Sequence, residues 1–211
     1  METRIGKTRK SRLWCKTRQV RRDGTHGLVG TIIGLRVESR KFHFVVHCDT
    51  SLMYFHSFVA HRTMVSFDQA RKMGEQAATG EISSYENTIK NMKRLIGLAF
   101  DDPRAKKEMK LVPFKWVPLK HALGGPDSIG VKVTVDGEEK TIAIEAVCGM
   151  MIHHMGMIAA KKASEISGNS MTDVAQFFPQ DWVIAIPSYY TDAQRRALLT
   201  ACEIVGVPTV Q

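Results

Sequence analysis

The hydrophobic pattern is clearest near the end of the chain, where it predicts a strand, a turn and a helix. Residues 182–186 form a continuous apolar run rich in β-branched side chains, which is typical of a strand covered on both faces. Pro187 follows and lacks the N–H that would continue a strand ladder. Thr191 and Gln194 fit a capping box, and Gly206 suits a left-handed stop, so we expect a helix between them. This order of elements indicates an α/β sheet.

The same pattern predicts helices and strands elsewhere in the chain. Apolar residues repeat at helical spacing in residues 74–79, 86–98 and 145–167. Alternating residues predict antiparallel strands at 111–119 and on either side of Asp136-Gly137, and β-like runs occupy 27–37 and 41–60. The helix faces expected to be buried comprise Ile89, Met92, Leu95 and Ile96; Val147, Met151, Met155, Ile158 and Ala159; and Ala197, Leu198, Ala201, Ile204 and Val205.

Two motifs resemble one known family and occur in the family's order. They are IPSYYTDAQRRAL at residues 186–198 and MGEQAATGEISSYENTIKNMKRLIGLAFDDP at residues 73–103. Both are similar to stretches of the ATPase domain in the 70-kDa heat-shock chaperone superfamily, and TDAQRRAL looks more like the large 110-kDa branch. The resemblance implies a partial actin-like α/β domain at residues 63–211, made of the outer lobe and part of the first inner lobe. Residues 1–62 form a basic leader that matches nothing in the family.

The resemblance implies roles for five residues. Lys93 matches the family lysine that lies at the nucleotide cleft and stabilises charge on the transferring phosphoryl group, and Arg94 beside it approaches the nucleotide. Pro187, Asp192 and Arg195 match positions that relay nucleotide state to the interdomain surface. The implied parent binds ATP and Mg²⁺, acts in protein folding and the stress response, and serves as nucleotide exchange factor for a partner chaperone of the 70-kDa type.

The sequence departs from the family at its phosphate loops. The family opens with an acidic, Gly-rich turn that cradles the β- and γ-phosphates, and nothing in residues 1–63 matches that turn. The chain ends before the family's second phosphate loop, so we expect a fragment without either half of the phosphate clamp. The family is an ATPase, but we expect this chain alone to bind nucleotide very weakly or not at all and to hydrolyse none, because Lys93 has no clamp to work within.

Positive charge is concentrated ahead of the resembling region. Residues 1–62 hold 13 Lys and Arg against 4 Asp and Glu, which matches the formal net charge of +9, whereas residues 63–211 hold 17 of each. The density of like charge in residues 1–22 favours disorder. Two alternatives to a chaperone fragment therefore stay open: a nucleic-acid-binding or targeting module carried by the leader on a degenerate chaperone scaffold, and a truncated product without a role of its own.

The distribution of cysteine, histidine and apolar residues predicts the cellular compartment and whether a metal or a membrane is bound. The four cysteines are dispersed and form no pair at zinc spacing, which indicates a reducing compartment; we expect the cytoplasm, with the nucleus as the alternative. His43, His47, His56 and His61 lack acidic or cysteine partners in the sequence, so we expect no metal site. No apolar run reaches the length of a membrane span, so we expect no membrane partner.

Overall fold

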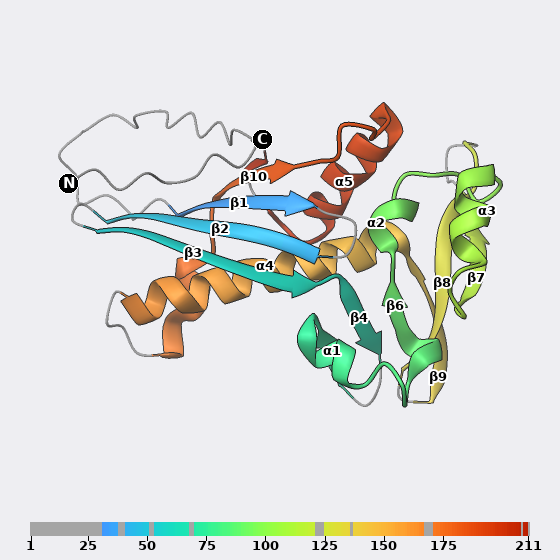
Figure 1. Cartoon of the computed structure of the whole chain (residues 1–211), viewed down its shortest axis with the longest axis horizontal. Coiled ribbons are helices and arrows are strands. Elements are labelled where there is room, and N and C mark those ends of the chain that lie inside the picture. The colour runs from blue at the N-terminus through green and yellow to red at the C-terminus, as the bar shows by residue number, and fades with distance from the viewer. Residues whose placement is uncertain are drawn as a thin grey trace, which may run out of the picture.

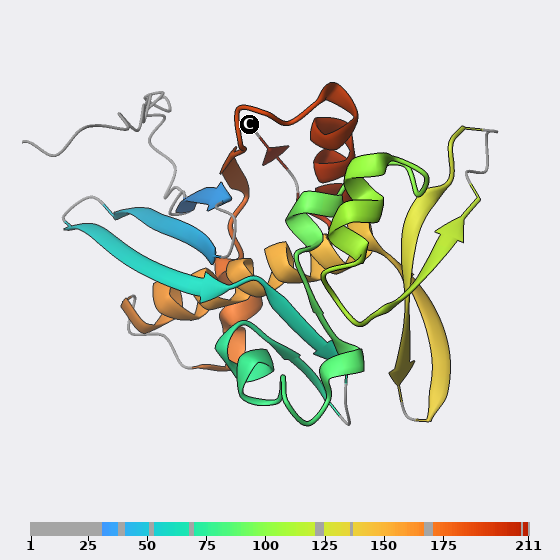
Figure 2. The same ribbon diagram turned by 45° about the vertical axis from the view of Figure 1, so that its right-hand side comes forward.

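The computed structural model describes residues 31–37, 41–50, 53–67, 70–120, 125–135, 137–166, 171–207 and 209–210. A five-stranded sheet lies along one side of the long helix α4 (Ile144–Ile166), and two smaller sheets gather toward the other end of that helix (Figure 1). The view in Figure 2 keeps the two groups of strands apart, with α4 running between them. This mixed architecture confirms the α/β class predicted from the sequence.

The five-stranded sheet combines strands from distant parts of the chain. β1 pairs with β10 in parallel and with β2 in antiparallel fashion, and β2 and β3 form a long hairpin. Residues 31–62, which the sequence assigned to an unmatched leader, therefore supply three strands to the sheet that holds the predicted C-terminal strand. The expectation of disorder for residues 1–22 lies outside the described residues. In spatial order the strands are β11 (Thr209–Val210), β10 (Asp181–Ala185), β1 (Thr31–Val37), β2 (Lys41–Thr50) and β3 (Met53–Arg62).

Two antiparallel three-stranded sheets and several short helices form the predicted outer lobe. β8 and β9 form the hairpin that the sequence predicted, and Gly137 in its turn has a φ of 82°. One sheet is β5 (Arg71–Met73), β4 (Met64–Phe67) and β6 (Thr88–Lys90); the other is β7 (Lys115–Leu119), β8 (Ser128–Val135) and β9 (Glu138–Ala143). The helical turns are α1 (Glu75–Thr79), η1 (Tyr85–Asn87), α2 (Met92–Leu95) and α3 (Pro103–Met109).

Helix α4 contributes to one continuous core that includes residues of both regions. Its predicted face is buried, except that Ile158 is half-buried. Helix α5 (Asp192–Ile204) crosses it where Gly149 allows close approach, because a Cβ there would lie 2.7 Å from the carbonyl oxygen of Ala201. Further along α4, Gly156 makes room for Phe178, which follows η2 (Met171–Phe177). Small residues on α4 thus set how closely its neighbours pack.

The predicted helix at residues 86–98 is wrong. The structure has the turn η1, the strand β6 and the four-residue helix α2 there. Asn91, in the left-handed region at a φ of 62°, lies between β6 and α2. Ile89 is buried because it pairs with Val65 of β4, not because it lies on a helix face. All four apolar residues expected to be buried are buried, so the pattern located core positions but not their backbone conformation.

Two predictions about the C-terminal unit also need correction. Strand β10 buries Trp182 and Ile184, but Val183 is 44% exposed, so only one face of the strand is covered in this chain. On α5, Ile204 is 54% exposed and Cys202 is buried in its place. The helix turns Ile204 outward because the contact face follows Leu198, Ala201 and Cys202 toward α4.

Candidate functional site

The turn between β10 and α5 is fixed by hydrogen bonds at both ends. The amide of Tyr190 donates to the carbonyl oxygen of Pro187 at 3.1 Å. The amide of Gln194 donates to the hydroxyl oxygen of Thr191 at 3.4 Å, and the Thr191 amide donates back to the Gln194 side chain at 3.2 Å. The predicted capping box is therefore confirmed, and it satisfies two amides at the start of α5.

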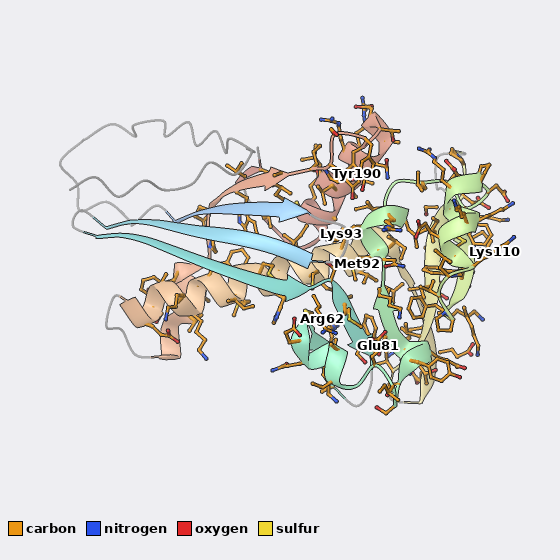
Figure 3. All side chains as sticks on the ribbon, in the orientation of Figure 1. Arg62, Glu81, Met92, Lys93, Lys110 and Tyr190 are labelled. Carbon is orange, nitrogen blue, oxygen red and sulfur yellow. The ribbon has the colours of Figure 1, made fainter. Side chains whose placement is uncertain are left out.

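Tyr190 connects this turn to helix α2. Its side chain is buried, and its hydroxyl donates a 2.5 Å hydrogen bond to the carbonyl oxygen of Lys93. Its own carbonyl oxygen accepts from Nε of Arg195 at 3.3 Å. Figure 3 labels Tyr190 and Lys93 close together where α2 approaches α5. Together with its amide bond to Pro187, Tyr190 therefore contacts three of the five residues that the family resemblance singled out.

Lys93 is only 5% exposed, and its helix α2 packs against helix α4. Burial raises the pKa of the Cys148 thiol on α4; the negative charge of Glu145 raises it further, and the positive charge of Lys93 lowers it. The Glu145 carboxylate and the Lys93 ammonium group therefore both lie close enough to the Cys148 thiol to affect its pKa.

Arg94 and Asp192 are held by other partners. Nη1 of Arg94 donates to both carboxylate oxygens of Glu108 on α3, at 2.9 and 3.2 Å. Asp192 accepts from Nε of Arg196 at 2.8 Å, one turn along α5, and both side chains are exposed. The structure therefore brings Lys93, Pro187 and Arg195 together through Tyr190 but leaves Arg94 and Asp192 outside that group.

A second contact joins the same two segments. Gly97, two residues beyond α2, has a φ of 66°. A Cβ at Gly97 would lie 2.6 Å from Cα of Gln194 and 2.7 Å from the carbonyl oxygen of Ala193. We call residues 92–97 and 187–195 with these contacts the junction. The glycine in KRLIG thus allows the backbone to rest against the first turn of α5.

The sequence reasoning missed Tyr190 and Gly97. Tyr190 adjoins Tyr189, and nothing local distinguishes the two, although one is buried and the other is 68% exposed. A buried tyrosine usually gives its hydroxyl a hydrogen-bond partner, which was the available signal. Gly97 was part of a recognised motif, but its role depends on a helix almost a hundred positions away.

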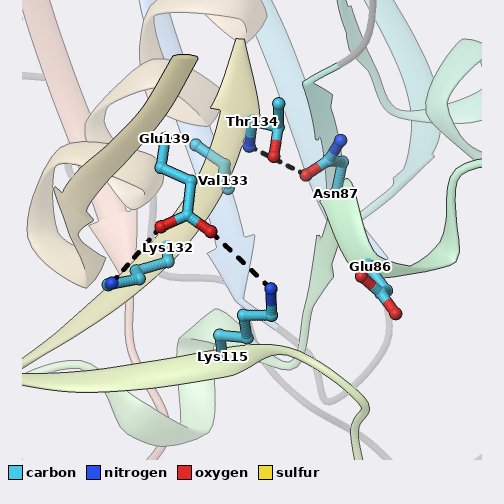
Figure 4. A pocket seen from close by; sticks show the side chains of 7 residues that line it. All are labelled: Glu86, Asn87, Lys115, Lys132, Val133, Thr134 and Glu139. Carbon is cyan, nitrogen blue, oxygen red and sulfur yellow. Dashed lines mark hydrogen bonds and ion pairs between the residues drawn. The ribbon is translucent and has the colours of Figure 1, made fainter. Parts of the chain in front are cut away.

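A shallow hollow in the outer lobe lies apart from the junction (Figure 4). Its Lys115 and Lys132 ammonium groups lie 3.7 and 3.4 Å from the carboxylate of Glu139, which neutralises part of their charge. The hydrogen bond from Lys132, with the charges of both lysines, lowers the pKa of Glu139. Beside them, the amide of Thr134 on β8 donates to the side-chain oxygen of Asn87 on η1 at 3.0 Å. The hollow contains none of the predicted site residues.

The described residues contain neither a metal cluster nor a helix suited to a membrane. Within them, no three His, Cys, Asp or Glu side chains are grouped to hold a metal ion. The side chains of His43, His47, His56 and His61 lie outside what the structure describes. In the same part of the chain, no helix combines the length and apolarity that a bilayer crossing requires.

Comparison with known proteins agrees with the two motifs at the junction. The profile of the family described as Hsp70 protein matches residues 57–211. The chain is 33% identical over 141 residues to "Heat shock protein 110" of Caenorhabditis elegans, covering 67% of this chain and 16% of that protein. It is 33% identical over 146 residues to a "97 kDa heat shock protein" of Strongylocentrotus purpuratus, covering 69% and 14%. It is 32% identical over 139 residues to human "Heat shock 70 kDa protein 4L", covering 66% and 14%.

These matches cover most of this chain but a small part of each relative: the matched stretch spans 16% of the nematode protein's length. The match to the family profile begins within β3 and continues through the junction to the last residue. The outer sheets, the Lys93 segment and the turn into α5 all lie inside the matched region. The chain belongs to the Hsp70 family, of whose ATPase domain residues 57–211 form a part.

Proposed function

We propose that the chain is part of a longer chaperone. In that parent, this part transmits the conformational effect of the bound nucleotide to the surface of the ATPase domain. The observation that carries the proposal is the convergence of Lys93, Pro187 and Arg195 on Tyr190, because Lys93 and Tyr190 are 97 positions apart in the sequence. We propose further that the parent acts as a nucleotide exchange factor for a partner 70-kDa chaperone. Relatives named "Heat shock protein 110" and "97 kDa heat shock protein" support this branch.

The residues at the junction fit the chemistry of an ATP site in part. A bound ATP with Mg²⁺ supplies phosphoryl charge that a lysine ammonium group stabilises. Lys93 is the residue we propose for that contact, and its carbonyl oxygen is held by the Tyr190 hydroxyl. Arg94 does not fit equally well, because both its contacts with Glu108 would have to break before it could approach a nucleotide.

Pro187 and Arg195 hold the turn between β10 and α5, which is the segment we propose to respond to a bound nucleotide. The Pro187 carbonyl oxygen fixes the Tyr190 amide, and Arg195 fixes the Tyr190 carbonyl oxygen, so a movement of Lys93 is opposed from both sides of Tyr190. A ligand shifts such a turn only if it binds one arrangement better than the other. We propose that ATP in the parent provides this difference.

Two measurements test the function. The intact mass of the endogenous protein should be several-fold larger than the 23.6 kDa of this chain. The purified parent should then accelerate release of a labelled ADP from a partner 70-kDa chaperone by about tenfold or more, which corresponds to about 1.4 kcal/mol or more of barrier lowering. A heat-inactivated sample of the parent is the control. Unchanged ADP release, in a mixture where binding to the partner is demonstrated, would refute the exchange role.

The charge of the leader favours a second candidate function, nucleic-acid binding through residues 1–62, which carry 13 Lys and Arg against 4 Asp and Glu. Such binding should weaken steeply with salt, with a log–log slope of about −0.9 for each phosphate neutralised on duplex DNA. Deletion of residues 1–30, which precede β1, should abolish it if this candidate is correct. Affinity that is unchanged by both salt and deletion would exclude it.

A further inference from the structure

The amides that follow helix α2 satisfy only some of its carbonyl groups: Ile96 donates to Met92 at 3.0 Å and Leu98 to Leu95 at 3.1 Å. The last four carbonyl oxygens of any α-helix lack intrahelical partners, and α2 has only four residues. The chain leaves the helix at Ile96, whose ψ of 130° is not helical. The carbonyl oxygen of Lys93 is therefore at a helix end that needs a donor from elsewhere. The Tyr190 hydroxyl is such a donor, at 2.5 Å.

All three polar groups of Tyr190 are engaged within the junction. The amide bonds to Pro187, the carbonyl oxygen to Arg195 and the hydroxyl to Lys93. Its ring is buried in the core, and burial raises the pKa of its hydroxyl, which therefore stays protonated and able to donate. The residue is consequently fixed in position more fully than Tyr189, which is exposed and contacts Tyr190 edge to face.

We infer that Tyr190 is a positioning residue for Lys93: its hydroxyl holds the Lys93 backbone at the end of α2 and so sets where the Lys93 ammonium group lies against α4. This inference rests on the proposed role of Lys93 in the parent. It assigns the mechanical link between the turn and Lys93 to the Tyr190 side chain, whereas Pro187 and Arg195 act on the Tyr190 backbone. Loss of one oxygen atom at position 190 should then loosen the Lys93 backbone without removing any charge.

The test compares Tyr190→Phe with Tyr189→Phe in the 211-residue chain. Hydrogen exchange followed by mass spectrometry should show amides of residues 93–97 exchanging about tenfold faster in Tyr190→Phe, while amides of β8 are unchanged. Acetylation of Lys93 by acetic anhydride should also accelerate relative to exposed Lys107. Tyr189→Phe should leave both rates as in the wild type.

Two results would overturn the inference. One is an equal increase of exchange in residues 93–97 and in β8, because that would indicate general destabilisation without a local role. The other is unchanged exchange and unchanged Lys93 acetylation in a folded Tyr190→Phe chain. Neither readout uses ATP or a partner, so a parent that lacks exchange activity would refute the proposed function and leave this test of Tyr190 intact.

Discussion

Gly97 and Gln194 are in backbone contact: a methyl group on Gly97 would lie 2.6 Å from Cα of Gln194. This contact fixes the loop after α2 against the first turn of α5. With the bond from Tyr190 to Lys93, it means that the two family motifs form one packed unit although they are far apart in the sequence.

Substitution of Gly97 by alanine should therefore be strongly destabilising. We expect a loss of about 3 kcal/mol in the free energy of unfolding, because the new Cβ meets backbone atoms that cannot move aside and the φ of 66° is strained for alanine. Urea unfolding measures the loss. Gly206→Ala is the matched control, since its φ is 71° but nothing lies within 4 Å of its Cβ position. Equal losses in the two variants would show that the contact with α5 contributes nothing.

Thr191 should stabilise α5 through its cap. Thr191→Ala removes the acceptor for the Gln194 amide, and we expect a loss of about 1 kcal/mol in the free energy of unfolding. Thr200→Ala, at an exposed position within the same helix, is the control and should change stability by less than about 0.5 kcal/mol. Equal effects at the two positions in urea unfolding would contradict the capping role.

Stability should fall in alkaline solution because two thiols are buried on α4 and α5. Burial raises the pKa of Cys148, and burial followed by the charge of Glu203 raises the pKa of Cys202 to about 11. Both thiols ionise near their ordinary value of 9.0 when the chain unfolds, so unfolding releases protons above that pH. Stability is therefore fully present below about pH 9 and should fall toward pH 11.

The expected slope is at most about 1.4 kcal/mol per pH unit for each thiol. Urea unfolding at a series of pH values measures it. Cys202→Ala should start from a lower stability but lose less of it between pH 9 and pH 11. A free energy of unfolding that stays constant across this range would contradict the burial of both thiols.

This chain alone should bind Mg-ATP weakly, with a dissociation constant of about 1 mM or more. Lys93 is 5% exposed, Arg94 is paired with Glu108, and residues 1–63 contain no turn that matches the family's phosphate cradle. Isothermal titration calorimetry measures the affinity, with a titration of Mg²⁺ alone as the control. Micromolar binding of Mg-ATP would show that this expectation is wrong.

The sequence predicted the C-terminal unit well because its signals are local. A proline ends the strand, a threonine and a glutamine cap the helix, and Gly206 ends it, each acting within a few residues. The predicted helix at residues 86–98 was wrong because Ile89 and Met92 have helical spacing, whereas the backbone of Ile89 pairs with strand β4. Pairing with a strand more than twenty positions away leaves no mark in the local pattern.

The junction could be predicted only in part for the same reason. Family resemblance pointed to Lys93, Pro187 and Arg195 separately, and the structure shows that Tyr190 joins them. The exposed face of β10 could not be predicted either. A run of apolar residues does not show whether the rest of the chain covers one face of the strand or both.

The most direct test of the account is ATP-driven release of the partner from the full-length parent carrying Pro187→Ala and Arg195→Ala. Arg195→Ala removes the donor to the Tyr190 carbonyl oxygen, and Pro187→Ala frees the backbone φ that proline fixes at the start of the turn. The account therefore predicts that ATP accelerates release at least about tenfold less than in the wild type, a loss of about 1.4 kcal/mol of coupling. Arg196→Ala, which breaks only an exposed pair with Asp192, should retain normal release. Normal ATP-driven release in the double variant would contradict the claim that the junction transmits nucleotide state.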